Sequence, residues 1–159
     1  MEFFTIGVYN CSESEFFNKL VQNRIDTFLD IRQRRGVRGS QYAFVNSNRL
    51  QHRLKELNIK YGYIDTLAPT TAIRELQKQI DLEKGELKTQ RKELGKVFII
   101  EYKNRILKNF DFDNFLESLY REGAHRIALF CVEEHSEACH RSIVAEKLHN
   151  TYYYHINHL

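Results

Sequence analysis

The chain has 159 residues, and its 24 lysines and arginines against 21 aspartates and glutamates give a formal net charge of +3. A length of this order predicts one domain over residues 1–159, with a core large enough to need no disulfides or structural metal. The near balance of charge excludes the strong overall basicity that by itself indicates a nucleic-acid partner, so any such function must depend on local clusters.

The cysteines and the amino terminus indicate the compartment. Three cysteines at irregular spacing, without a CxxC pair, argue against a disulfide framework and favour a reducing environment. The first residues carry an acidic Glu2 and too short an apolar run for a signal peptide, and no segment reaches the roughly 20 apolar residues that span a membrane. We therefore expect a cytoplasmic monomer or homodimer with no membrane partner.

Apolar runs and helix signals alternate along the first part of the chain. Residues 2–8 predict a strand, and Ser12 followed by Glu15 forms the capping-box pattern that begins a helix. A second apolar run over 25–31 predicts another strand, and it ends in the polar, glycine-broken segment RQRRGVRGSQ (32–41). This segment is expected to be a loop.

The middle of the chain is strongly charged. The leucine spacing predicts a helix over 48–58, and the run 59–64 predicts a third strand. Pro69, the only proline, stands where a helix is expected to begin. Charges alternate in sign over 69–95, which is typical of a solvated helical surface, and Gly85 is expected to interrupt it.

The last third completes the alternation. Residues 96–107 suit a strand by β-branched content or a helix by length, whereas 112–123 is clearly helical. Residues 125–132 predict a buried strand, 136–149 a helix and 151–156 a last strand. Strands that alternate with helices and are apolar on both faces predict a three-layer α/β sandwich, with a mainly parallel central sheet flanked by helices.

Polar groups follow several of the predicted strands. In open parallel sheets, ligands bind beyond the carboxyl ends of the strands. Four segments fall there: Thr5–Asn10, Asp30–Arg32, Cys131–Glu133 and Cys139–Arg141. We expect all four to converge on one rim of the sheet.

Three motifs among these segments resemble a known family. TIGVYN (5–10), LDIRQRRG (29–36) and FCVEEHSEACHRSIVAEKL (130–148) are similar to the domain-of-unknown-function family 488. That family typically shows TIGHSN, a DVR strand end with a basic loop, and a CxE strand end followed by CHR on a helix. The resemblance spans nearly the whole chain and implies a small intracellular α/β domain of prokaryotic type, but no established activity.

Carried over position by position, the family's polar residues fall on these ten: Thr5, Gly7, Asn10, Asp30, Arg32, Cys131, Glu133, Cys139, His140 and Arg141. The chain departs from the family at Val8 and Tyr9, where His and Ser are usual. LAPT (67–70) also replaces a glycine-rich pair. If that histidine were an essential acid or base, this chain would lack it.

Four interpretations of CVEEHSEACHR (131–141) remain open. Zinc could be held by Cys131, His135, Cys139 and His140, but adjacent residues on a helix point about 100° apart, and a strand-end cysteine can face the core. We therefore expect no metal and no cofactor. A second interpretation is a nucleophilic Cys139 activated by a helix amino terminus and His140, with a disulfide to Cys131 as a further alternative.

The third and favoured interpretation is an anion site, in which the helix amino terminus and Arg141 bind phosphate or carboxylate. The nearby loop adds Arg32, Arg34, Arg35 and Arg38. In the fourth, Arg32 and Arg141 only pair internally with Asp30 and Glu133.

These patterns predict an enzyme that acts on a phosphorylated, nucleotide or nucleic-acid substrate. The catalytic candidates are Asp30, Glu133, His140 and Cys139, and the substrate-binding candidates are Thr5, Asn10, Arg32, Arg35, Arg38, Cys131 and Arg141. Proximity of Asp30 and Glu133 would raise the pKa of one of them. The alternative is a non-catalytic nucleic-acid-binding module, in which loop 32–44 grips the backbone and Tyr42 or Phe44 stacks on a base.

Overall fold

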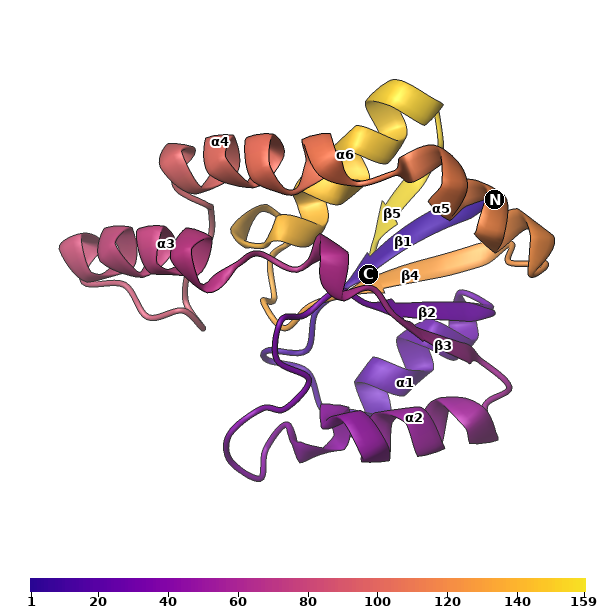
Figure 1. The fold of residues 1–159 in the computed structure, drawn as a ribbon. Helices are drawn as coiled ribbons and strands as arrows, with labels where there is room; N and C mark the ends of the chain where they lie inside the picture. The colour runs from indigo at the N-terminus through magenta and orange to yellow at the C-terminus, as the bar shows by residue number, and fades with distance from the viewer.

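A computed structural model describes all residues, 1–159, and shows a five-stranded, all-parallel sheet in the order β3-β2-β4-β1-β5 (Figure 1). The strands are β1 (Glu2–Ile6), β2 (Thr27–Asp30), β3 (Lys60–Tyr63), β4 (Arg126–Phe130) and β5 (Ile156–His158). The helices are α1 (Glu13–Gln22), α2 (Ser47–Glu56), α3 (Thr71–Lys84), α4 (Lys96–Arg105), α5 (Phe112–Arg121) and α6 (His140–Tyr152). None of these helices has both the length and the apolar character that a membrane crossing requires.

Helices cover both faces of the sheet. Helices α1 and α2 lie on one face, and α4, α5 and α6 lie on the other (Figure 1). Because successive side chains in a strand point to opposite faces, Phe3 and Phe4 belong to different apolar clusters. Phe3 packs with the α4–α6 side, whereas Phe4 packs with Phe16 and Leu20 of α1. The predicted three-layer α/β sandwich is confirmed.

The strand order creates a crevice at the carboxyl edge. Strands β1 and β4 are adjacent, with Ile6 paired to Phe130, but the chain leaves them in opposite directions. From β1 it passes through α1 to β2, on the far side of β4, and from β4 it passes through α6 to β5, on the far side of β1. Such a switch point is where open α/β sheets bind ligands.

Local signals explain most of the element boundaries. The capping box of Ser12 and Glu15 is present at the start of α1, and the Asp111 side chain caps α5. Gly85, with φ of 65°, ends α3, because the left-handed conformation costs glycine little. The ambiguous run 96–107 contains helix α4, the second of the two conformations expected for it.

The predicted boundaries of the last two elements were wrong. A short 3₁₀ turn occupies Ser136–Ala138, and α6 begins only at His140, with Cys139 extended at its amino-terminal cap. At the other end, the last strand lies at Ile156–His158 and not over 151–156, because α6 continues to Tyr152 and ends where Tyr153 takes φ of 61°. Tyr152 is the last residue of α6, and its ring packs on the ring of Phe112, with centroids 6.0 Å apart.

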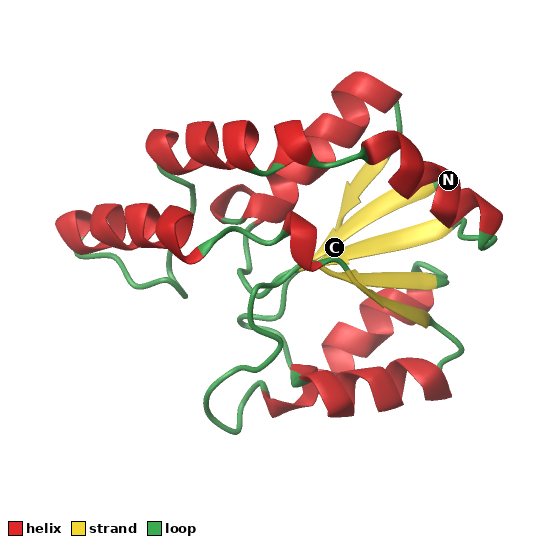
Figure 2. Cartoon of the chain, in the orientation of Figure 1, coloured by secondary structure: helices red, strands yellow, loops and turns green.

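The longest connections lie at the carboxyl edge of the sheet (Figure 2). The loop after β2 extends on the α2 side of the sheet, and α3 with α4 projects past the strand ends on the other side (Figures 1 and 2). The carboxyl terminus lies near the same edge (Figure 1). The space between these projections contains the candidate site.

Candidate functional site

A cleft of about 740 Å³ opens at the carboxyl edge of the sheet. One wall comes from the strand ends and the loop after β2, including Arg32, Arg34 and Arg38. The opposite wall comes from α3 and the irregular segment 86–95. Residues at the end of β4 and the start of α6 form the floor, as expected for the switch point between β1 and β4.

The lining of the cleft concentrates positive charge. Its basic residues are Arg32, Arg34, Arg38, Arg74, Lys78, Lys88 and Arg91, and its acidic residues are Glu75, Asp81 and Glu133. The lining therefore has four more positive than negative side chains, whereas the whole chain has an excess of only three. A cleft lined by one sign of charge focuses the field and attracts anions.

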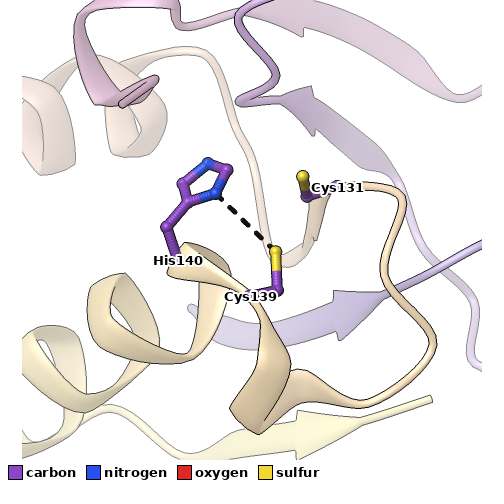
Figure 3. Close-up of side chains that lie close together, drawn as sticks. All are labelled: Cys131, Cys139 and His140. Carbon is purple, nitrogen blue, oxygen red and sulfur yellow. Dashed lines mark hydrogen bonds between the residues drawn. The ribbon is translucent and has the colours of Figure 1, made fainter. Parts of the chain in front are cut away.

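Two thiols and an imidazole meet on the floor (Figure 3). The Sγ atoms of Cys131 and Cys139 and a ring nitrogen of His140 all lie within 4.8 Å of one another, and all three residues are buried. Cys139 Sγ is 3.7 Å from His140 Nδ1, and His140 Nε2 is 3.0 Å from the Ile31 carbonyl oxygen. Hydrogen bonding with Cys139 and burial raise the pKa of Cys131 well above its ordinary value.

A buried carboxylate lies beside these thiols. Cys131 Sγ donates to Glu133 Oε2 over 3.1 Å, while Arg91 Nη2 and Lys88 Nζ approach Glu133 Oε1 to 3.1 and 3.2 Å. Burial alone would raise the pKa of Glu133, but Lys88 and Arg91 together hold it well below its usual range. Arg91 Nη1 also donates to Asp81 Oδ2 over 2.8 Å, which ties helix α3 to the floor.

One guanidinium nitrogen of Arg32 has no hydrogen-bond partner in the protein. Its Nε and Nη2 donate to the two carboxylate oxygens of Asp30 over 2.8 and 2.7 Å, and Nη2 also donates to the Val45 carbonyl over 3.0 Å. The guanidinium lies over the Phe130 ring, 4.6 Å from its centroid. The side chain is only 3% exposed, yet Nη1 has no partner in the protein. Arg141 Nε is the other buried side-chain nitrogen without a partner, but Arg141 does not line the cleft, so Arg32 Nη1 is the unpartnered donor that adjoins it.

Arg141 has a different environment, although it is equally buried. Its Nη1 and Nη2 donate to the carbonyl oxygens of Glu133 and Glu134 over 2.6 and 2.8 Å, and the residue does not line the cleft. Gly7 makes this packing possible, because a Cβ there would lie 2.0 Å from the Glu133 carbonyl oxygen. Arg141 thus shapes the turn after β4 from behind the site.

The comparison with known proteins gives one result. Residues 12–148 match the family described as "Domain of unknown function DUF488". The chain belongs to the DUF488 family. Neither the curated proteins nor the solved structures gave a match.

This DUF488 domain departs from the family motif at Val8 and Tyr9, and the structure shows where these two side chains lie. Val8 is fully buried in the cluster on the α1 and α2 side, so position 8 offers no acid or base. Tyr9 lines the cleft, with its ring 5.4 Å from that of Tyr42. Burial, only partly offset by Lys88, raises the pKa of Tyr9, which favours its neutral hydroxyl.

The structure brings only some of the predicted site residues to the cleft of the DUF488 domain. Those that line it are Arg32, Arg38, Cys131, Glu133, Cys139 and His140. Those that do not are Thr5, Asn10, Asp30, Arg35 and Arg141. Thr5 contacts His158, Asn10 donates to Glu134, and the Arg35 guanidinium lies over the Tyr63 ring, 4.4 Å from its centroid.

The expected coupling between the two buried carboxylates is not what the structure shows. Asp30 and Glu133 were expected to raise the pKa of one of them by proximity. Instead each carboxylate has a cation of its own, Arg32 for Asp30 and Arg91 for Glu133, and the pKa of Glu133 is lowered. The two carboxylates therefore do not form a shared acid–base pair.

Sequence reasoning missed the cleft residues of segment 69–95 in this DUF488 domain. Gln77, Asp81 and Arg91 are buried there, although the alternating charges indicated a solvated surface. Gln77 Nε2 donates to Asp81 Oδ1, and Gln77 Oε1 accepts from the Gly95 N–H, so the segment is held by a polar network. One signal was present, because Ile73, Gln77 and Asp81 are spaced four apart and continue one helix face from an apolar residue into polar ones.

Proposed function

We propose that this DUF488 protein is an enzyme that acts on a phosphorylated substrate, with nucleotides and nucleic acids among the candidates. The phosphate binds in the cationic cleft, and the reacting group lies against the floor of Cys131, Glu133, Cys139 and His140. The family description assigns no activity, so this proposal depends on the chemistry of the site alone.

The observation that carries the proposal is the unpartnered Nη1 of Arg32. A buried donor without a partner costs roughly 1–3 kcal/mol, more for a charged group, so such atoms are rare in folded proteins. Asp30 already holds the other side of the guanidinium, which fixes the direction of Nη1 without neutralising its hydrogen-bonding capacity. A phosphate oxygen would satisfy this donor by a charge-assisted hydrogen bond, once the groups that close Nη1 off from the cleft move aside.

The charge and position of the cleft support the same ligand. Its excess of basic side chains attracts an anion, and their placement on both walls suits a group with several charged oxygens. The start of helix α6 lies on the floor, where the positive end of the helix dipole adds to the field. Arg141, whose Nη1 and Nη2 donate to backbone carbonyls, does not line the cleft and has no part in binding here.

The floor offers the groups that an enzyme needs. Cys139 and His140 are in contact, as a nucleophile and its base must be, and Glu133 is an ionised carboxylate held in place by two cations. Buried ionisable side chains in a cleft are candidates for function, because burying a charged group is costly unless it is paired. Their joint position under an anion-binding cleft is the reason to propose catalysis rather than binding alone.

The alternative of a non-catalytic nucleic-acid-binding loop has weaker support. Phe44 is buried in the core, and Tyr42 packs on Tyr9 while its hydroxyl accepts from the Asn10 N–H. Neither ring is a free stacking platform of the kind that such modules use. The exposed loop cations Arg34 and Arg38 instead line the cleft, which suits a phosphate-bearing substrate.

Phosphate protection tests the binding half of the proposal. Inorganic phosphate and a mononucleotide should each raise the melting temperature relative to sodium chloride of equal ionic strength, because a ligand that binds only the folded state stabilises it. The double variant Arg34→Gln/Arg38→Gln should lose most of this protection. Arg35→Gln removes a charge from the same loop but outside the cleft, and it should keep the protection; equal losses in both variants would refute the assignment.

Turnover tests the catalytic half. Nucleotides and short oligonucleotides incubated with the protein would be followed by mass spectrometry of the products. Cys139→Ser and Glu133→Gln should abolish turnover while phosphate protection persists, since neither change removes a cleft cation. If turnover persists in both variants, the proposed catalytic role of Cys139 and Glu133 is wrong.

A further inference from the structure

We propose that Cys131, Cys139 and His140 bind a zinc ion on the floor of the cleft, through two thiolate sulfurs and one imidazole nitrogen. Zinc is bound in proteins by this combination of ligands, and two sulfurs with one nitrogen suit a borderline-soft divalent cation. With a metal bound, Cys139 and His140 would act as its ligands in place of nucleophile and base, and the inference rests on the proposed function only for how the metal is used. Its binding can be measured separately.

The spacing of the donor atoms fits a tetrahedral metal. Ligands at the usual Zn–S and Zn–N distances lie about 3.5–3.8 Å from one another at tetrahedral angles. Cys139 Sγ and His140 Nδ1 are 3.7 Å apart, and the Cys131 sulfur lies within 4.8 Å of both donor atoms. Figure 3 shows that the three side chains come from two segments, the turn after β4 and the start of α6, and point toward a common space.

The second ring nitrogen of His140 supports the assignment independently. Nε2 lies 3.0 Å from the Ile31 carbonyl oxygen, which can only accept, so Nε2 carries a proton. Nδ1, the ring nitrogen nearer to Cys139 Sγ, is then the one left to bind a metal. Metal-binding histidines in proteins almost always donate their other N–H in this way, because the contact fixes the tautomer and orientation of the ring.

The backbone conformation at Cys139 allows two adjacent residues to bind one metal, although adjacent residues inside a helix point in different directions. Two adjacent residues inside a helix diverge, but Cys139 is the extended cap residue, with φ of −139° and ψ of 145°, and only His140 belongs to α6. The change of backbone conformation between them lets both side chains face Cys131. The amino terminus of α6 also favours a thiolate at Cys139, because its dipole stabilises negative charge there.

A metal at this place would keep an open coordination position. Three protein ligands with a fourth position for water or substrate are typical of catalytic zinc, whereas structural sites have four protein ligands. Glu133, although its Oε2 is 3.1 Å from Cys131 Sγ, is not among the side chains whose donor atoms all converge. Because all three ligands line the cleft, the open position would face the bound anion.

Cobalt substitution tests the site. The reduced protein is stripped with a chelator and titrated with Co²⁺, and it should bind one equivalent with the intense visible bands of tetrahedral cobalt and a thiolate-to-cobalt charge-transfer band. Zinc added afterwards should displace the cobalt and raise the melting temperature. Cys131→Ser and Cys139→Ser should each lose about half of the charge-transfer intensity, because each removes one of two thiolates. His140→Gln should abolish the tetrahedral spectrum.

Two matched variants control for other thiols and imidazoles. Cys11→Ser removes the third cysteine, and His135→Gln removes an exposed histidine of the same turn; both should bind cobalt like the wild type. The inference is overturned if the reduced wild-type protein gives no tetrahedral spectrum or if Cys11→Ser loses as much intensity as the ligand variants. The wild-type titration keeps the test decisive even if a ligand variant fails to fold. If phosphate raises the melting temperature but cobalt does not bind, the metal site is refuted and the proposed function is not.

Discussion

The two walls of the cleft hold their buried charges by different means. On the sheet wall, Arg32 pairs with Asp30, two residues away on a central strand. On the helical wall, Arg91 joins Asp81, ten residues away, to Glu133, 42 residues away. The first pair is local and set in the core, whereas the second spans separate parts of the chain.

This difference predicts how each wall responds to damage. Asp30 and Arg32 of the sheet wall cannot move without disturbing β2, every residue of which pairs with β4. The helical wall, in contrast, contacts the floor through a few polar bonds. Arg91 donates to the Ala138 carbonyl, Lys88 pairs with Glu133, and the Leu94 N–H donates to the Glu137 carbonyl. Loss of a charge should therefore unfold the protein globally in one case and release a segment locally in the other.

The largest effect is expected for Asp30→Ala. The carboxylate is fully buried and accepts from Arg32 and from the Tyr61 hydroxyl, so its removal leaves the Arg32 guanidinium buried without a counter-charge. Removing one partner of a buried ion pair costs about 3–5 kcal/mol. Urea denaturation should show a loss of this size in the free energy of unfolding.

Glu56→Ala is the matched control for that prediction. Glu56 also pairs with an arginine, Arg53, over 2.7 Å, but on the exposed surface of α2. Exposed pairs contribute about 0–1 kcal/mol, so the two variants should differ severalfold in destabilisation. Equal effects would show that the Asp30 pair is not the strong structural element that its burial implies.

A smaller and more local effect is expected for Arg91→Gln. The change leaves Asp81 and Glu133 without their shared partner, but segment 86–95 can expose both carboxylates by moving away from the floor. We expect a loss of about 1–3 kcal/mol, and hydrogen exchange that accelerates mainly over 86–95. Lys92→Gln alters an exposed neighbour and should change neither measurement. Exchange that accelerates equally throughout β2 and β4 would contradict the separation of the two walls.

The two walls were also unequally predictable from the sequence. Arg32, Cys131 and Glu133 follow apolar runs, and parallel strands place their carboxyl ends together, so convergence of these residues could be inferred from strand order alone. Arg91 and Lys88 lie in a stretch whose charge pattern matches that of a solvated helix. Only docking of this stretch against the turn after β4 makes them part of the site, and docking leaves little trace in local sequence.

The geometry of the cleft floor was harder to predict from the sequence than its residues. The residues of the Cys131, Cys139 and His140 cluster were identified, but their geometry depends on a helix boundary that was placed four residues too early. With Cys139 inside a helix, its sulfur and the His140 ring would diverge. With Cys139 as the extended cap, they converge. Boundaries are the least certain part of any inference from sequence, and here one boundary decides whether these three side chains diverge or converge.

The smallest effect is expected for Lys78→Gln, which tests whether Lys78 of the helical wall contributes charge to the bound ligand. Lys78 of α3 lines the cleft and Lys84 of the same helix does not, while both are exposed and each lies near a glutamate. A unit charge about 10 Å from a phosphate in water contributes roughly 0.4 kcal/mol, or about a twofold change in affinity. Lys78→Gln should therefore weaken phosphate binding about twofold at low salt, with the difference disappearing at high salt, whereas Lys84→Gln should bind like the wild type. Isothermal titration at two ionic strengths measures both. If Lys78→Gln and Lys84→Gln bind alike at low salt, Lys78 contributes no charge to the bound anion, although it lines the cleft.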